Sequence, residues 1–195
     1  MARLREFDEQ KALDAAMHVF WEKGFEATSL SDLTSKMGIQ RPSIYSAFGD
    51  KKELFEAALR KYTQFHASNV RARLQKKSSV IEAFRSYFES IVAEEYEEGP
   101  KPNRGCFCLN TMVELAPHDT KFAILTREHQ MYLSAIFQET IERGIRSGEL
   151  DNATNPLALA QTLVVSLIGL TVMMKSRPDR SFMNNSVESI LTLLK

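Results

Sequence analysis

The amino-acid sequence predicts an all-α fold of about nine helices. Proline and glycine are sparse among the 195 residues, at 6 and 8, which favours long uninterrupted helices over a turn-rich β fold. Apolar residues recur at helical spacing along most of the chain, and no stretch alternates apolar and polar residues as a half-buried strand does. Apolar residues make up 44% and charged residues 26%, a composition typical of a soluble globular protein.

Capping residues and glycines mark the ends of the first two helices. The first is expected over Phe7–Lys23, with Gly24 placed to end it in the left-handed conformation of a helix C-terminus. The second is expected to begin after Ser29 and to end at Gly38. Ser29 and Asp32 have the spacing of a capping box, in which each side chain binds a free backbone N–H of the other residue.

The third helix is short and the fourth is long. The third is expected over Arg41–Phe48, where Pro42 is tolerated because backbone N–H groups in the first turn have no helical partner. Asp50 and Glu53 form a second capping box at the start of the fourth helix, which is expected to continue past Arg71.

The remaining helices are mostly long and amphipathic. A fifth carries an apolar stripe from Val80 to Val92, and the Gly-Pro-Lys-Pro-Asn run at 99–103 is expected to be an exposed loop. Asn155 and Pro156 are suited to the cap and the first position of the eighth helix. The later helices are expected over Gly105–Leu115, Asp119–Ser147, Pro156–Lys175 and from about Asp179 to Lys195.

Two short helices joined by a glycine turn between Ser29 and Lys52 indicate a helix-turn-helix, whose second helix enters the major groove of DNA. The pattern by itself leaves other two-helix modules open. We expect an N-terminal three-helix domain that contains this helix-turn-helix at residues 1–50 and a larger C-terminal helical bundle at residues 51–195. Because the formal net charge is zero, DNA binding must depend on a local patch.

The amino-acid sequence of this segment resembles that of the TetR (tetracycline-repressor-like) family of bacterial transcriptional regulators. The resemblance covers about Leu13–Leu59 without a gap, and the remainder of the chain agrees in helical character and length. The runs that carry it are Gly24-Phe25-Glu26-Ala27-Thr28-Ser29-Leu30, Asp32-Leu33, Met37-Gly38-Ile39, Ser43-Ile44-Tyr45-Ser46-Ala47-Phe48 and Lys51-Lys52-Glu53-Leu54-Phe55.

The resemblance implies that the chain is a repressor that binds double-stranded palindromic operator DNA as a homodimer and is released by a small-molecule effector. It also implies roles for residues of the helix-turn-helix. Phosphate contacts position such a protein and base contacts specify its site; arginine pairs with guanine and glutamine with adenine. The expected DNA-binding residues are Thr28, Ser29, Tyr45 and Lys51 at phosphates, Gln40, Arg41 and Ser43 at base edges, and Ser46 beside them.

Three of these assignments have alternatives. Tyr45 could be a core aromatic, and Lys51 could belong to a solvated helix start. Gln40 departs from the small hydroxyl residue common at its position, so it serves as a helix cap or as a base contact. The basic residues Arg3 and Arg5 could add contacts to the phosphates or the minor groove.

The resemblance also implies that the bundle at residues 51–195 binds the effector and dimerises, with its last two helices pairing with their copies. A dimer is needed because two recognition helices must lie about 34–36 Å apart to enter successive major grooves. An uncharged helix over Leu157–Met174 suits an interface that resembles a core cut in half, and we interpret it so rather than as a membrane span. The interface candidates are Leu163, Leu167, Leu170, Val187, Ile190, Leu191 and Leu194, with burial inside one subunit as the alternative.

An effector pocket between the helices would be lined by aromatic and methionine side chains, which adapt to irregular ligands. Plain core packing is the alternative for each of them. The candidates are Phe84, Phe88, Phe107, Met112, Met131, Tyr132 and Met173.

Cys106 and Cys108 lie two positions apart beside the basic Arg104. An activated thiolate needs a basic neighbourhood, so a thiol- or electrophile-sensing regulator is an alternative function. Inert buried cysteines are the default interpretation, and no metal site or cofactor is expected because the Cys and His spacings fit no standard zinc pattern.

Other functions remain as alternatives. A DNA-binding activator or a nucleoid-organising protein would share the helix-turn-helix but lack release by an effector. An enzyme is not expected, because the sequence offers no nucleophile–base pair, phosphate loop or metal triad. The N-terminus lacks the apolar core of a signal peptide, and two cysteines are too few to staple a secreted chain, so we expect a cytoplasmic protein.

Overall fold

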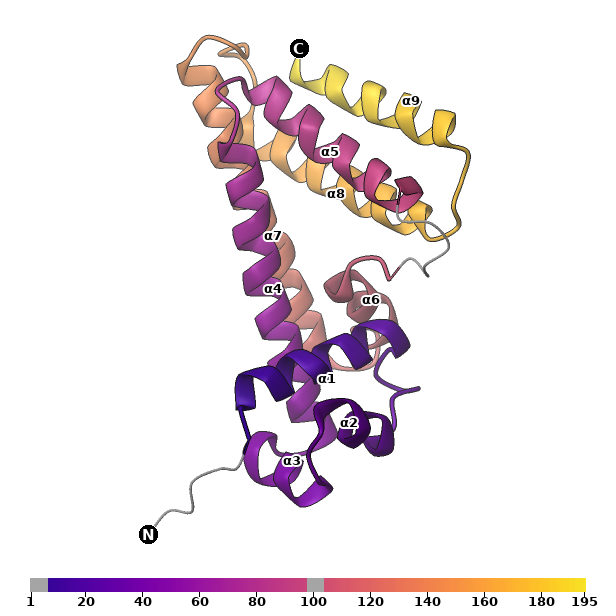
Figure 1. Ribbon diagram of the computed structural model, residues 1–195. Helices are drawn as coiled ribbons and strands as arrows, with labels where there is room; N and C mark the ends of the chain where they lie inside the picture. The colour runs from indigo at the N-terminus through magenta and orange to yellow at the C-terminus, as the bar shows by residue number, and fades with distance from the viewer. Residues whose placement is uncertain (1–6, 98–103) are drawn as a thin grey trace. The chain divides into compact units, whose positions relative to one another are not determined.

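The computed structural model describes residues 7–97 and 104–195, and it is helical throughout the described ranges (Figure 1). The all-α prediction is confirmed. The helices are α1 (Glu9–Lys23), α2 (Leu30–Met37), α3 (Arg41–Phe48), α4 (Lys51–Gln75), α5 (Val80–Glu97), α6 (Phe107–Glu114), α7 (Thr120–Arg146), α8 (Pro156–Met174) and α9 (Arg180–Leu191), with a final 3₁₀ turn at Thr192–Leu194. Arg3, Arg5 and the expected loop at 99–103 lie outside the described residues.

Helix boundaries follow the caps read from the sequence. Asn155 caps α8, as expected, by accepting the N–H of Ala158 at 3.1 Å. Helix α1 begins at Glu9 rather than at Phe7, because Asp8, which was not expected as a cap, caps it. Both expected capping boxes, at the starts of α2 and α4, are formed. Gly24 ends α1 with a positive φ of 82°, as expected, but its ψ of 178° sends the chain onward extended rather than in the expected left-handed helical turn.

The described residues form two compact units. The first unit contains the chain up to Phe65 together with Phe107–Thr126; the second contains His66–Cys106 together with Arg127–Lys195. This grouping differs from the division at residue 50 expected from the sequence, because α6 and the start of α7 pack with α1–α3. Helices α4 and α7 each run from one unit into the other.

The first unit is built around the ring of Phe55 on α4. Phe55 is fully buried and contacts four other phenylalanine rings edge to face, the arrangement that aromatic quadrupoles favour. The ring centroids lie 4.9 Å from Phe20, 5.2 Å from Phe25, 5.2 Å from Phe107 and 5.3 Å from Phe122. These rings come from α1, the α1–α2 turn, α6 and α7, so one side chain joins the elements of the unit.

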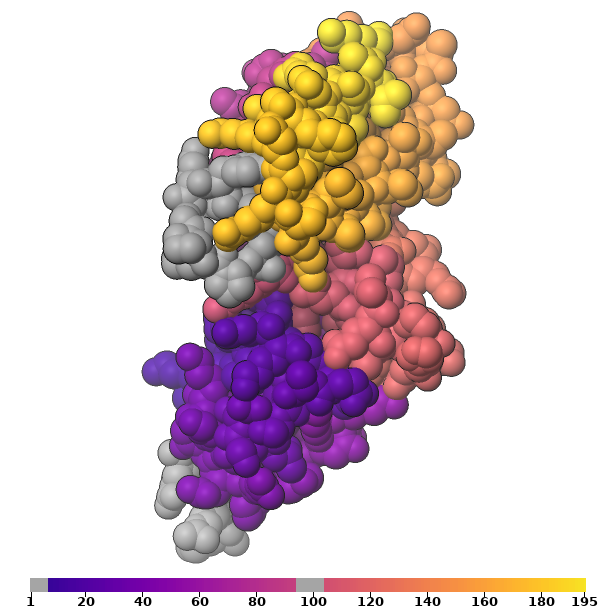
Figure 2. Space-filling view, turned by 90° about the vertical axis from the view of Figure 1, so that its right-hand side faces the viewer, coloured from indigo at the N-terminus to yellow at the C-terminus, as the bar shows by residue number. Residues whose placement is uncertain are grey.

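The second unit packs α5 against α8 and α9. In Figure 2 the yellow α9 and orange α8 lie side by side on one face. The carboxylate of Glu149 binds the N-terminus of α5, accepting the N–H groups of Val80 at 2.7 Å and Ile81 at 3.0 Å. Burial opposes the charge of Glu149, but the hydrogen bonds from Ser79 and from these N–H groups outweigh it and lower the pKa of Glu149.

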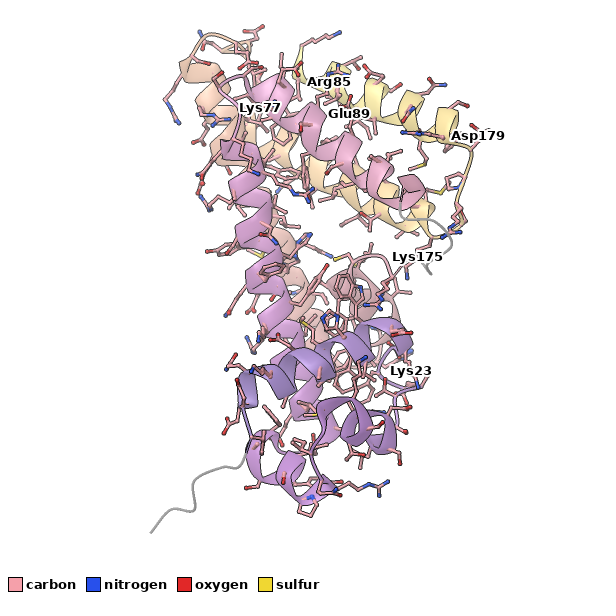
Figure 3. All side chains as sticks on the ribbon, in the orientation of Figure 1. Lys23, Lys77, Arg85, Glu89, Lys175 and Asp179 are labelled. Atoms are coloured by element: carbon pink, nitrogen blue, oxygen red, sulfur yellow. The ribbon has the colours of Figure 1, made fainter. Side chains whose placement is uncertain are left out.

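Ion pairs join α5 to its neighbours at the surface of the second unit. Arg85 lies beside Glu89 on α5, 3.5 Å from its carboxylate, and also pairs with Glu188 of α9 (Figure 3). The hydrogen bond to Glu188 is the main cause of the raised pKa of Arg85. Because both glutamates are exposed and Arg85 is only half-buried, we expect the pairs to orient α9 more than to stabilise it.

We expect Phe55→Ala to lower the free energy of unfolding by about 3–5 kcal/mol, because the substitution removes a fully buried ring and leaves a cavity among four others. Urea denaturation followed by circular dichroism would measure this change. Phe65→Ala is the matched control: Phe65 lies on the same helix but is 66% exposed, so its loss should change the free energy by less than about 0.5 kcal/mol. Equal effects of the two substitutions would contradict the central role of Phe55.

Candidate nucleic-acid interface and effector-unit interior

The α2–turn–α3 segment has the geometry of a helix-turn-helix. The side chain of Ser29 accepts the N–H of Asp32 at 3.1 Å, and α2 ends at Gly38 in the left-handed conformation with φ 69°. Leu33 and Ile44 are fully buried and hold α2 and α3 against the rest of the first unit. The polar side chains of α3 are therefore left on its outer face.

The exposed face of α3 presents the residues expected to read DNA. Gln40, Arg41 and Ser46 are exposed, and Ser43 is half-buried. Gln40 occupies the cap position of α3 without a side-chain capping hydrogen bond, so its amide is not used to cap the helix. Tyr45 is 51% exposed, which contradicts the alternative that it is a core aromatic.

Arg41 is oriented by its neighbour on α2. Its Nη2 donates to Ser31 Oγ at 3.1 Å. Both residues are exposed, so this bond holds the guanidinium at the surface of the two helices. A guanidinium has five N–H donors, so others remain for a bidentate contact with guanine.

The start of α2 differs from expectation. Thr28 is 2% exposed, and its hydroxyl donates to the carbonyl oxygen of Gly24 at 2.5 Å. That hydroxyl is turned inward, so the phosphate contact expected of it is not available in this structure. Ser29 is exposed, but its hydroxyl donates to Asp32 Oδ2 at 2.7 Å. The ion pair with Lys23, followed by the bonds from Ser29, holds the pKa of Asp32 well below its usual range.

The two lysines at the start of α4 have separate surroundings. The Nζ of Lys51 lies 4.4 Å from the ring centroid of Phe25, a cation–π contact that leaves its side chain half-buried. Lys52 instead pairs with Asp119, with 2.5 Å between Nζ and Oδ2. Lys51 is thus held against the first unit rather than belonging to a freely solvated helix start.

The seven residues expected to line an effector pocket are not brought together. Phe84 and Phe88 are fully buried in the second unit, whereas Phe107 and the half-buried Met112 belong to the first. Three others are exposed: Met131 by 66%, Tyr132 by 60% and Met173 by 42%. Met131 and Tyr132 lie on the exposed side of α7, so expecting them to line a pocket was wrong. The buried side of this helix carries Leu133, Ile136 and Phe137.

The interface candidates on α8 and α9 also lie elsewhere than expected. Leu163, Leu167, Leu170, Val187, Leu191 and Leu194 are at most 6% exposed within one chain, and Ile190 is half-buried, so these side chains pack against α5 instead. Exposed apolar side chains of α8, α9 and the final 3₁₀ turn are the ones left for a partner. They are Leu157, Val165, Val172 and Met173 on α8, Phe182 on α9 and Leu193 in the turn.

Among the described residues, α8 is long and apolar enough by length and composition to cross a membrane. In the structure its inner face belongs to the core of the second unit. Its exposed apolar side chains are among those named above as left for a partner. A core face and a partner face together account for the largely apolar composition of α8 without a lipid environment.

The two cysteines differ in burial. Cys106 is half-buried and directly precedes the first residue of α6, while Cys108 is buried within that helix.

A pair of histidines that sequence reasoning missed lies inside the second unit. His66 Nδ1 and His129 Nε2 are 3.1 Å apart, so one imidazole donates to the other. Desolvation is the main cause that lowers the pKa of each to about 4. Each histidine occupies a core position of its helix, four residues after buried Tyr62 on α4 and four after buried Leu125 on α7, and that spacing was the available signal.

We expect the second unit to lose stability as the pH falls from about 6.5 towards about 4. The folded-state pKa of both histidines lies below the unfolded value, so the unfolded chain binds protons first, with a slope of up to about 1.4 kcal/mol per pH unit for each histidine. Thermal unfolding as a function of pH would measure the effect. His129→Gln should flatten the slope, and His118→Gln, at an exposed site on the α6–α7 turn, should not. A slope that both variants share would contradict this origin.

Comparison with known proteins supports the same architecture. Residues 12–58 match the family model described as bacterial regulatory proteins, tetR family, and residues 81–190 match the tetracyclin repressor-like, C-terminal domain. The uncharacterized HTH-type transcriptional regulator YezE of Bacillus subtilis (strain 168) is 34% identical over 195 residues, covering 100% of both chains. The HTH-type transcriptional repressor ComR of Escherichia coli (strain K12) is 34% identical over 172 residues, covering 87% of this chain and 80% of ComR.

Solved structures agree with these matches. The TetR family transcriptional regulator CifR, in a cysteine-substituted form complexed with 26-base-pair operator DNA, superposes with a TM-score of 0.85 at 32% identity over 100% of both chains. A TetR-family regulator from Cytophaga hutchinsonii has the same fold, with a TM-score of 0.84 at 22% identity, covering 97% of this chain and 96% of the other. The family models together span the helix-turn-helix and most of the second unit, and the chain therefore belongs to the TetR family of bacterial transcriptional regulators.

Proposed function

We propose that this chain represses transcription by binding a palindromic operator as a homodimer, and that a small molecule entering the second unit releases it. The observation that carries the proposal is the outer face of α3, where Gln40, Arg41 and Tyr45 are exposed on a helix whose inner face is buried. Polar and basic side chains on a rigid helix of this kind suit the major groove. The operator-bound state of CifR and the repressor role of ComR support the same function.

Release follows from a population shift between two states of the dimer. The effector can move this equilibrium only as far as its affinities for the DNA-binding and the released states differ. Both α4 and α7 connect the two units along the chain. They therefore provide a continuous helical path from the second unit, which the effector enters, to the first unit, which contains α3.

We place the protein in the cytoplasm and assign it no catalytic step and no cofactor. The thiol- or electrophile-sensing alternative stays a prediction that depends on Cys106, the more accessible of the two cysteines. The alternative of an activator without effector release shares the α3 surface. Release from DNA by a small molecule would separate it from the proposed repressor.

We expect Arg41→Ala to cost about 1–3 kcal/mol of operator binding and to relax specificity at one base position. Lys51→Ala should weaken binding to all sequences about equally and reduce the salt slope by about one. Both effects would be measured by mobility-shift titration on a duplex that the wild-type protein enriches from a random-sequence pool. Arg146→Ala removes an exposed arginine from the end of α7 in the second unit and serves as the control.

Two results of that titration would count against the proposal. Unchanged affinity of Arg41→Ala would mean that α3 does not read the bases. Wild-type binding that follows salt but enriches no sequence would indicate a nucleoid-organising protein instead.

We further expect Val165→Glu to convert the dimer into a monomer, because it places a charge in the outer apolar face of α8. Light scattering after size-exclusion chromatography should show the mass fall from twice the chain mass of 22.2 kDa to that mass. Val113→Glu is a matched control, since Val113 on α6 is exposed by the same 68% but lies off this face. A dimer that survives Val165→Glu would place the interface on another surface.

A further inference from the structure

Glu114, the last residue of α6, lies against the backbone of the α1–α2 turn. Its Oε2 accepts the N–H of Phe25 at 3.1 Å and its Oε1 accepts the N–H of Glu26 at 2.9 Å. The two partners are 89 and 88 positions away in the sequence, and all three residues belong to the first unit. Hydrogen bonds to a carboxylate are stronger than neutral ones, and a pair of them fixes orientation as well as distance.

The turn is shaped to receive this carboxylate. Gly24 has a φ of +82°, a conformation that residues with a side chain rarely adopt. A Cβ at that position would also lie 2.8 Å from Glu114 Oε2 and 3.0 Å from Oε1. The backbone angle therefore favours glycine here, and a Cβ at this position would displace the carboxylate from the turn.

The same turn carries the start of α2. The Thr28 hydroxyl donates to the Gly24 carbonyl oxygen, and Ser29 then caps α2. Three residues, Ala27 to Ser29, thus separate Glu26 from the first residue of α2, the helix N-terminus that faces DNA in the proposed function. A helix N-terminus attracts phosphate by its dipole and its free N–H groups, so its position affects operator binding.

We propose that Glu114 is a positioning residue that couples α6 to the DNA-binding end of α2. Helix α6 begins directly after Cys106, the last residue of the second unit's first segment, so a displacement of Cys106 with the second unit moves the start of α6. The carboxylate then passes that displacement to the turn, and α2 moves relative to α3. This inference rests on the proposed operator binding and names the contact through which that binding is regulated.

Glu114→Gln tests the coupling with little change in shape. A glutamine amide has one acceptor oxygen, and its NH₂ group repels the second backbone N–H, so at most one of the two bonds survives. Glu128→Gln, at an exposed position on α7, removes the same charge and is the matched control. Both variants and the wild-type protein would be titrated with the duplex that the wild-type protein enriches from a random-sequence pool.

Three readouts separate coupling from a structural or an electrostatic role. We expect Glu114→Gln to bind the duplex at least about fivefold more weakly, with an unchanged salt slope because no phosphate contact is lost. The backbone amides of Phe25 and Glu26 should exchange hydrogen faster. Binding of the duplex should slow exchange in α6 of the wild-type and control proteins, and this protection should be absent in Glu114→Gln.

Unchanged duplex affinity together with faster exchange at Phe25 and Glu26 would overturn the proposal, because the contact would then be broken without consequence. A salt slope reduced by about one would assign Glu114 a long-range electrostatic effect instead. If Glu114→Gln loses cooperative unfolding, Glu114→Asp keeps the charge while withdrawing the carboxylate from the turn, and the same readouts apply. Loss of cooperative unfolding in both would show a structural role only, whereas failure of the wild-type protein to enrich any duplex would overturn the proposed function itself.

Discussion

The burial of Phe55 is the constraint on which the first unit depends. Its ring touches phenylalanines from α1, the α1–α2 turn, α6 and α7, so these elements cannot shift independently without opening a void in a densely packed interior. Edge-to-face contacts also restrict the angles at which the rings meet. The consequence for function is that α6 is packed against the same ring as α1 and the α1–α2 turn, from which the chain enters α2.

Carboxylates at helix ends add hydrogen bonds to backbone N–H groups, beside the packing of the aromatic core. Asp32 and Glu53 close capping boxes next to their own helices, whereas Glu149 and Glu114 bind backbone N–H groups from distant segments. Each satisfies peptide groups that have no helical partner. The local pairs define where helices begin. The distant pairs decide how helices are placed against one another, and the ion pair of Asp32 with Lys23 likewise links α2 to α1.

Surface and core were harder to separate for the second unit. On α8 apolar residues occur around most of the helix, so their periodicity did not separate the face that packs in the core from the face that meets a partner. The leucines expected at a dimer interface proved to be buried against α5. On α7 the expected pocket residues Met131 and Tyr132 lie on the solvent side. The paired histidines escaped notice because a polar residue at a core position becomes meaningful only when its partner on another helix is known.

The sequence by itself determined the helical class, the helix boundaries at capping residues, and the family through the helix-turn-helix motif, because capping and the helix-turn-helix depend on residues within a few positions of each other. Only the tertiary structure decided that α6 belongs with the DNA-binding helices, that Thr28 turns its hydroxyl inward, and which face of α8 remains open. These features depend on contacts between segments far apart in the chain, and their energies come from packing and hydrogen bonds that local patterns do not encode.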